Sequence, residues 1–131
     1  MLVALNGNEK TISNLSISAG DRNGVFSQIK GSTIYNLTLD NVNIVSTGRA
    51  GILAGEIDGT GNSLSNITIK NSSVSGNSSN GVGVFIGYST PGFASTINNI
   101  TILNSTALNA NQAAGVIFGL IVVLLLLPTY T

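Results

Sequence analysis

Hydrophobic and polar positions recur along the chain in a phrase of seven residues. In order, the phrase reads Thr or Ser, Ile or Leu, any residue, Asn, Leu or Ile, Ser or Thr, and Ile or Leu. Apolar and polar positions alternate after the Asn, which is typical of a strand with one buried face. Across the Asn the apolar spacing is three, so a straight strand would point those two side chains in opposite directions. The phrase occurs at 11–17, 33–39, 63–69 and 96–102.

The Asn within each phrase predicts a bend in the chain. Asn tolerates the left-handed backbone, and a bend at this position would turn both flanking apolar residues toward one core. A second Asn follows two residues after each of the last three phrases, with an apolar residue three positions later. Such regular offsets indicate turns stacked coil upon coil. The predicted corner residues are Asn14, Asn36, Asn66 and Asn99, and the predicted second Asn column is Asn41, Asn71 and Asn104.

A second, Gly-rich apolar phrase follows each copy of the first. The first phrases start 22, 30 and 33 residues apart, and the extra length lies in loops rich in Gly, Ser and Asn. β-Branched residues dominate both phrases and Gly and Asn interrupt them, which argues against helices. We therefore predict an all-β parallel β-helix (β-solenoid) of about four coils at 1–112. At 113–131 we predict a last-coil strand that runs into an apolar tail.

Both phrases resemble known β-helix repeats. The first resembles the corner-Asn sequence of right-handed parallel β-helices such as the pectate-lyase group. The second resembles the GLUG repeat, most clearly at 51–55 and 83–87, while the copy at 24–28 lacks the second Gly. GLUG repeats occur in large surface proteins, including adhesin-like proteins and the non-catalytic parts of bacterial immunoglobulin-A peptidases. The resemblance covers roughly 11–121 and implies an extracellular or cell-surface location.

Composition excludes several classes of site. Charged residues make up 8% of the 131 residues, and the five acidic and five basic residues, all between Glu9 and Lys70, cancel. No basic stripe is present, so we expect no nucleic-acid partner. The chain has no Cys and no His, which excludes disulfides, His-dependent triads and the usual zinc ligands. We expect no metal and no cofactor.

One polar patch is a candidate ligand site. Aligning the second phrases sets Gln28 beside Glu56 and Lys30 beside Asp58, with Tyr88 continuing the patch in the next coil. β-Helix lyases and hydrolases resemble one another in clustering Asp, Lys or Arg on one outward strand face. Glu56 and Asp58 would lie about 7 Å apart along a strand, compatible with paired-carboxylate hydrolysis. A merely structural cross-strand pair explains the same residues, and we predict no enzymatic activity.

Seven Asn residues begin N-x-[ST] sequons, the acceptor sequence for N-glycans. A stacked corner Asn would be inaccessible to a glycosyltransferase. Asn77, in the loop 75–79, is therefore the predicted acceptor. Outward Thr and Ser residues also raise an ice-binding hypothesis, which the uneven period disfavours.

The run from Ala113 to Leu127 is apolar and uncharged. As a helix its 15 residues would span about 22 Å, short of the roughly 30 Å of a bilayer core. The repeat instead predicts strand through Ile121, which leaves Val122–Leu127 apolar on both faces. Membrane contact at Val116–Leu127, a removable anchor signal and self-association are the alternatives for this segment.

These observations favour a non-catalytic cell-surface or extracellular module. We expect it to act as an adhesin-like or structural spacer, with carbohydrate or a cell-surface protein as its partner. One alternative is a filament or surface-layer subunit that assembles as a homo-oligomer through its coil ends. Another is a fragment of a β-helix carbohydrate-active enzyme that uses Glu56 and Asp58.

Overall fold

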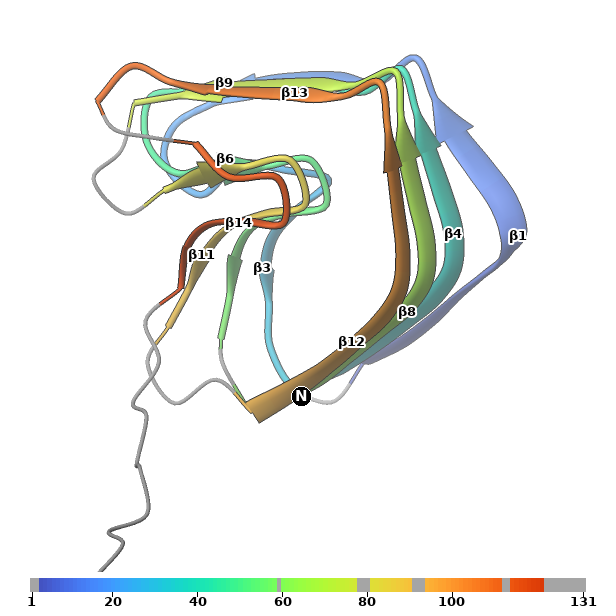
Figure 1. Cartoon of the computed structure of the whole chain (residues 1–131). Coiled ribbons are helices and arrows are strands. Elements are labelled where there is room, and N and C mark those ends of the chain that lie inside the picture. Colours follow the sequence, from blue (N-terminus) through green and yellow to red (C-terminus); the bar gives the residue numbers. More distant parts are fainter. Residues whose placement is uncertain (1–2, 59, 78–80, 91–93, 112–113, 122–131) are drawn as a thin grey trace, which may run out of the picture.

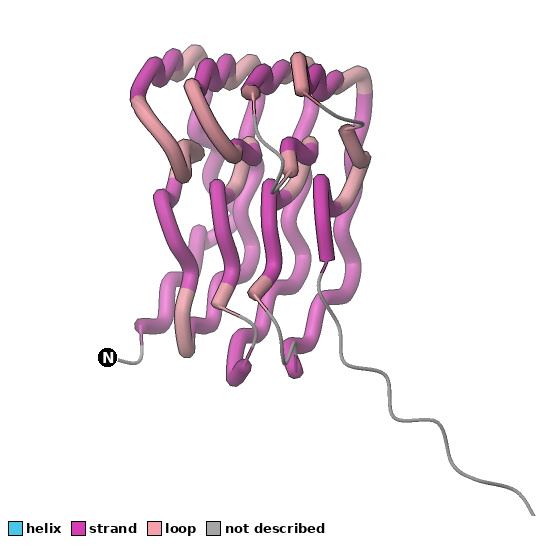
Figure 2. Tube along the Cα trace, turned by 90° about the vertical axis from the view of Figure 1, so that its left-hand side faces the viewer, coloured by secondary structure: helices cyan, strands magenta, loops and turns pink. Residues whose placement is uncertain are grey.

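The chain folds as an all-β parallel β-solenoid, as predicted, and makes about three turns (Figure 1). A computed structural model describes residues 3–58, 60–77, 81–90, 94–111 and 114–121, and these residues contain no helix. The chain passes four times through each of three parallel sheets. Successive coils lie side by side along the solenoid axis (Figure 2).

Each strand pairs with its equivalents in neighbouring coils. The first sheet has the order β1 (Val3–Ser13), β4 (Ser32–Asp40), β8 (Thr60–Lys70), β12 (Ala94–Leu103). The second sheet has the order β2 (Ser16–Ala19), β5 (Asn43–Ser46), β9 (Ser73–Gly76), β13 (Thr106–Asn109). The third has the order β3 (Phe26–Ile29), β7 (Ala54–Ile57), β11 (Ile86–Ser89), β14 (Phe118–Ile121). A short inner pair joins β6 (Ala50–Gly51) to β10 (Val82–Gly83).

Asn residues in the left-handed conformation bend the long strands, as predicted. Asn36 has φ 58° and Asn66 has φ 53°. Ile34 and Leu37, on either side of Asn36, are both buried in one core, which explains the apolar spacing of three. A second left-handed Asn, such as Asn41 with φ 55°, ends each of these strands and starts the turn into the second sheet.

The second phrase folds into the interior of the solenoid. Ile52 and Leu53 are fully buried there and lie in one apolar cluster with Phe85 of the next coil. Backbone packs directly against backbone between these coils. A Cβ added to Gly87 would lie 2.6 Å from the Ala50 oxygen, closer than real Cβ atoms approach other heavy atoms. The Gly residues of the phrase therefore permit close coil packing.

The predicted alignment of the first copy of the phrase is wrong. Thr11 pairs with Thr38 and Ile12 with Leu39, not with the residues that begin the second copy. Asn14 consequently lies beside Asn41 in the second Asn column, 27 residues away. The position opposite Asn36 is taken instead by a bulge between Asn6 and Lys10. The bulge inserts extra residues, so matching the letters of the phrase misplaces this copy.

The strand predicted at the end of the last coil is confirmed. β14 pairs with β11, and Gly115 forms an isolated bridge with Gly83. Among the residues that the structure describes, no helix could span a membrane. Val122–Leu127 lies outside the described residues. The structure therefore does not test membrane contact by this part of the segment.

Candidate functional site

The five residues of the polar patch lie together, in the predicted register, three on strands of the third sheet and Lys30 and Asp58 directly after β3 and β7. Gln28 pairs with Glu56, and Glu56 pairs with Tyr88 in the next coil. The Gln28 Nε2 donates to Glu56 Oε1 at 2.7 Å. Lys30 Nζ lies 3.1 Å from Asp58 Oδ2. The alignment of the second phrases thus predicted this cluster of side chains correctly.

Glu56 is buried beneath its neighbours. Only 7% of its side chain is exposed, although it occupies an outward strand position. Arg49 forms an ion pair with Glu56 Oε2, and Arg22 Nη1 lies 3.9 Å from Oε1. The cations and the Gln28 amide compensate the cost of removing this carboxylate from water.

Arg49 joins three coils, although it was not among the predicted residues of the patch. Its Nη2 donates to Asp21 Oδ2 of the first coil at 2.7 Å, and its Nη1 to Glu56 of its own coil. Its guanidinium lies over the ring of Tyr88 in the third coil, 5.5 Å from the centroid. We call Asp21, Arg49, Glu56 and Tyr88 the Arg49 clamp. In the sequence, only the position of Arg49 just before the second phrase indicated that it could reach the patch.

The clamp perturbs the titration of Asp21. Hydrogen bonds from the Arg49 side chain lower the pKa of the Asp21 carboxyl to about 2, against the opposing effect of partial burial. The same pairing raises the pKa of Arg49. Both groups are therefore charged throughout the physiological pH range.

The patch is poorly arranged for paired-carboxylate hydrolysis. Glu56 is buried and engaged by three neighbours, while Asp58 is paired with Lys30 and accepts a hydrogen bond from Thr90 Oγ1 at 3.3 Å. A hydrolytic pair must reach the scissile bond with both carboxyl groups. Among the described residues, no three acidic residues are grouped so that they could hold a metal ion.

Side-chain amides link the coils at the two corners. In the first Asn column, formed by Asn36, Asn66 and Asn99, Asn66 Nδ2 donates to Asn36 Oδ1 at 2.6 Å and Asn99 Nδ2 to Asn66 Oδ1 at 3.0 Å. Asn6 extends this column, because its Oδ1 accepts from Asn36 Nδ2. These amides hold equivalent corners in register.

The second Asn column contains four residues. Asn41 donates to Asn14, and Asn104 Nδ2 donates to Asn71 Oδ1 at 2.8 Å. Asn71 departs from the pattern and donates to Asp40 Oδ1 at 3.0 Å. The side chains of this column face solvent.

A column of Thr residues lies between the two Asn columns. Strand pairing aligns Thr with Thr in all four coils, and their apolar neighbours in the second and third coils are buried. Because side chains alternate along a strand, the Thr hydroxyls face outward at the spacing of adjacent strands, about 4.8 Å. The members are Thr11, Thr38, Thr68 and Thr101. This outward face repeats the same polar residue in all four strands of the first sheet.

The predicted glycan acceptor, Asn77, is exposed at the start of a loop. Its backbone N–H donates to the Gly48 oxygen at 3.2 Å. The remaining residues of its sequon lie outside the described residues. Glycosylation therefore stays a prediction.

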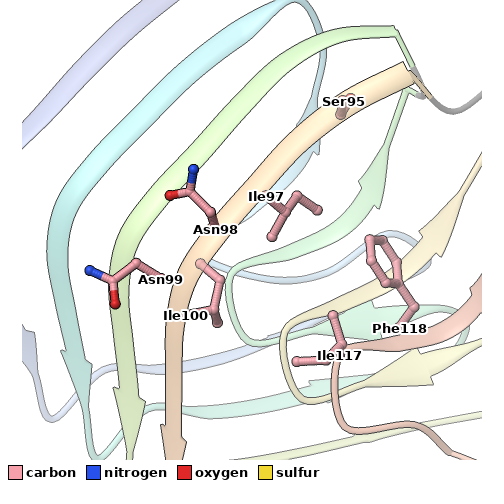
Figure 3. Close-up of a pocket in the computed structure, with 7 residues that line it drawn as sticks. All are labelled: Ser95, Ile97, Asn98, Asn99, Ile100, Ile117 and Phe118. Carbon is pink, nitrogen blue, oxygen red and sulfur yellow. The ribbon is translucent and has the colours of Figure 1, made fainter.

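Each end of the solenoid has an apolar hollow. The hollow in the last coil has a volume of about 430 Å³. Ile97 and Ile100 of β12 point toward it from one side, and Ile117 and Phe118, at the start of β14, from the other (Figure 3). The hollow at the first coil has a volume of about 230 Å³ and includes Leu5 in its lining. In both places the core is open because no further described coil covers it.

The comparisons with known proteins give no family for this chain. No protein-family model, curated protein or solved structure matches it. The β-solenoid architecture therefore rests on the structure, and the GLUG and pectate-lyase resemblance stays a prediction from the sequence.

Proposed function

We propose that this chain is a non-catalytic β-solenoid module of the cell surface or extracellular space, acting as an adhesin-like or structural spacer. The regular outward face of Asn and Thr columns supports the proposal most directly. Hydroxyls and amides repeated at the strand spacing match a ligand that itself repeats, such as a polysaccharide chain. The GLUG-like second phrase supports the surface location, by analogy with large surface proteins.

The charged patch supports a structural role better than a catalytic one. Its carboxylates are occupied by Arg49, Gln28 and Lys30. An enzyme of the β-helix type would need Glu56 or Asp58 free to act on substrate. No release of reducing ends from a panel of polysaccharides is therefore expected. If the wild type released reducing ends and the Asp58→Asn variant did not, the non-catalytic proposal would be overturned.

Binding to immobilised polysaccharides tests the outward face. Thr68→Arg places a bulky charge in the middle of the Thr column and should abolish binding to any polysaccharide that the wild type retains. Ser75→Arg is the matched control, because Ser75 faces outward from β9 in the second sheet. Equal binding by both variants would exclude the Thr column as the binding surface.

The location requires its own measurement. Antibodies against the chain should label intact, unpermeabilised cells of the source organism or the medium around them. Labelling only after permeabilisation would contradict a cell-surface or extracellular location.

A filament built from coil ends is the second candidate, because the core is open at both ends. Such a filament needs the two ends to fit each other. The bulge in β1 makes the first coil a poor match for β12 of the last coil, which keeps one register with β8 from Thr96 to Leu103. We therefore rank the filament below the spacer as a proposed function.

A further inference from the structure

The last coil exposes residues that the preceding coil buries. Val116 is 61% exposed, whereas Val84, at the equivalent position one coil earlier, is 2% exposed. Ile117 is 40% exposed and its equivalent, Phe85, is fully buried. We call the open surface of β12, β13, β14 and the turn 115–117 before β14, with the hollow of Figure 3, the C-terminal end face. It is a core surface without a cover among the described residues.

The apolar character extends around the rim of this face. Leu103 aligns with Lys70 and, one coil further, with Asp40, so an apolar side chain replaces charged ones at an outward position. Leu108 of the second sheet aligns with Ser75 and, one coil further, with the apolar Val45, and it is 69% exposed. The chain carries no charged residue after Lys70. The rim therefore favours an apolar, uncharged partner.

The opposite end of the solenoid is protected against pairing. The register of β1 shifts between Asn6 and Lys10, and this bulge includes the charged residue Glu9. In Figure 1, β1 lies outside the curve that β4, β8 and β12 share. Bulges and charged side chains are the usual devices that keep edge strands from pairing. β12 has neither device between Thr96 and Leu103.

We propose that the C-terminal end face binds the same face of a second copy, which gives an end-to-end dimer. An isologous contact brings identical surfaces together, and an uncharged surface can meet itself without like-charge repulsion. The edge of β12 also presents backbone N–H and C=O groups that require hydrogen-bond partners. Lipid hydrocarbon cannot supply them, whereas a second β12 can pair antiparallel across a two-fold axis.

The sequence after β14 fits the same arrangement. Val122–Leu127 begins directly after the last strand of the C-terminal end face and is apolar at all six positions. The sequence that follows this face therefore adds no charge that would oppose contact between two copies. The inference does not depend on the surface location or on polysaccharide binding.

Sedimentation equilibrium of the full chain tests the dimer. The expected mass is twice the 13.3 kDa of one chain. Val116→Lys places like charges at the contact and should weaken self-association by about 100-fold. An equimolar mixture of Val116→Lys and Val116→Glu should regain the dimer mass, because opposite charges then meet. Leu5→Lys, at the other end, is the matched control and should leave the dimer unchanged.

Three results would overturn the proposal. A wild type that stays monomeric at all concentrations would mean that its own C-terminal segment, or nothing, covers the face. Masses that grow beyond the dimer and fall with Leu5→Lys would indicate head-to-tail stacking. Flotation of a monomeric wild type with phosphatidylcholine vesicles, lost in Val116→Lys, would identify a lipid surface as the partner.

A distance measurement keeps the proposal testable if the charged variants do not fold. The chain has no Cys, so Val116→Cys and Leu5→Cys each provide one site for a spin label. Labels at position 116 of the two copies should lie much closer together than labels at position 5. The reverse order would contradict contact through the C-terminal end face.

Discussion

Asn41 donates a hydrogen bond from Nδ2 to Oδ1 of Asn14 at 2.8 Å, although 27 residues separate them in the chain. Both have left-handed backbones, with φ 55° and 60°. Asn suits this position for two reasons, because its backbone tolerates the corner and its amide both donates and accepts along the column. The local bend and the contact between coils thus depend on the same residue.

Replacing Asn66 should separate these two contributions. Asn66→Ala loses the bonds to Asn36 and Asn99 and also forces Ala into the left-handed region, at a total cost of about 3 kcal/mol. Asn66→Gly loses the same bonds without the strain and should cost about 1 kcal/mol. Urea unfolding of the two variants measures the difference. Equal losses would mean that the left-handed corner carries no strain.

The repeat predicts the fold because each phrase encodes a strand, a corner and an inward apolar pair. Three copies of the first phrase align as their letters indicate, for example Leu37 with Ile67. The first copy, 11–17, instead aligns with 38–44, Thr-Leu-Asp-Asn-Val-Asn-Ile. Both stretches begin with Thr, have Asn at the fourth position and end with Ile. The sequence was therefore compatible with two strand registers. Only packing, through the bulge before Lys10, selects one of them.

The candidate site was predictable only in part, and for a related reason. Gln28 and Glu56 occupy equivalent positions of the second phrase, so strand register alone brings them together. Arg49 and Asp21 lie in turns, where no periodic pattern fixes the direction of a side chain. Their contact spans 28 residues and depends on how the coils stack. Arg49, held by this contact, covers Glu56. The alternation of inward and outward side chains along the strand could not predict that burial.

Removing Arg49 should be costly because it leaves Glu56 buried without its main cation. Arg49→Ala should lower the free energy of unfolding by about 3 kcal/mol. The double variant Arg49→Ala, Glu56→Gln should recover part of this loss, because the neutral amide needs no counter-charge. Arg22→Ala is the control and should cost less than about 1 kcal/mol, since Arg22 is 44% exposed and lies 3.9 Å from the carboxylate. A double variant less stable than Arg49→Ala would argue against an uncompensated charge.

Acid should weaken the solenoid through Asp21. Its pKa is lowered to about 2 in the folded protein from an ordinary value of 3.8, so the folded state favours the ionised form. The resulting stabilisation is fully present above about pH 4 and is lost as the pH falls toward 2. Because Asp21 is half exposed, solvent screening limits the effect to about 1 kcal/mol. Stability measured from pH 5 to 2 should fall less steeply in Asp21→Asn than in the wild type. Identical slopes would contradict this role.

Close coil packing makes one glycine far less replaceable than another. A Cβ at Gly87 would lie 2.6 Å from the Ala50 oxygen and 2.7 Å from the Gly55 oxygen, and backbone atoms cannot move aside. Gly87→Ala should therefore cost about 3 kcal/mol or more. Gly31 has a left-handed φ of 55° but no atom within 4 Å of an added Cβ, so Gly31→Ala should cost only about 1 kcal/mol of backbone strain. Thermal unfolding followed by circular dichroism compares the two variants. If Gly31→Ala proved the more damaging, backbone conformation rather than contact between coils would decide which glycines can be replaced.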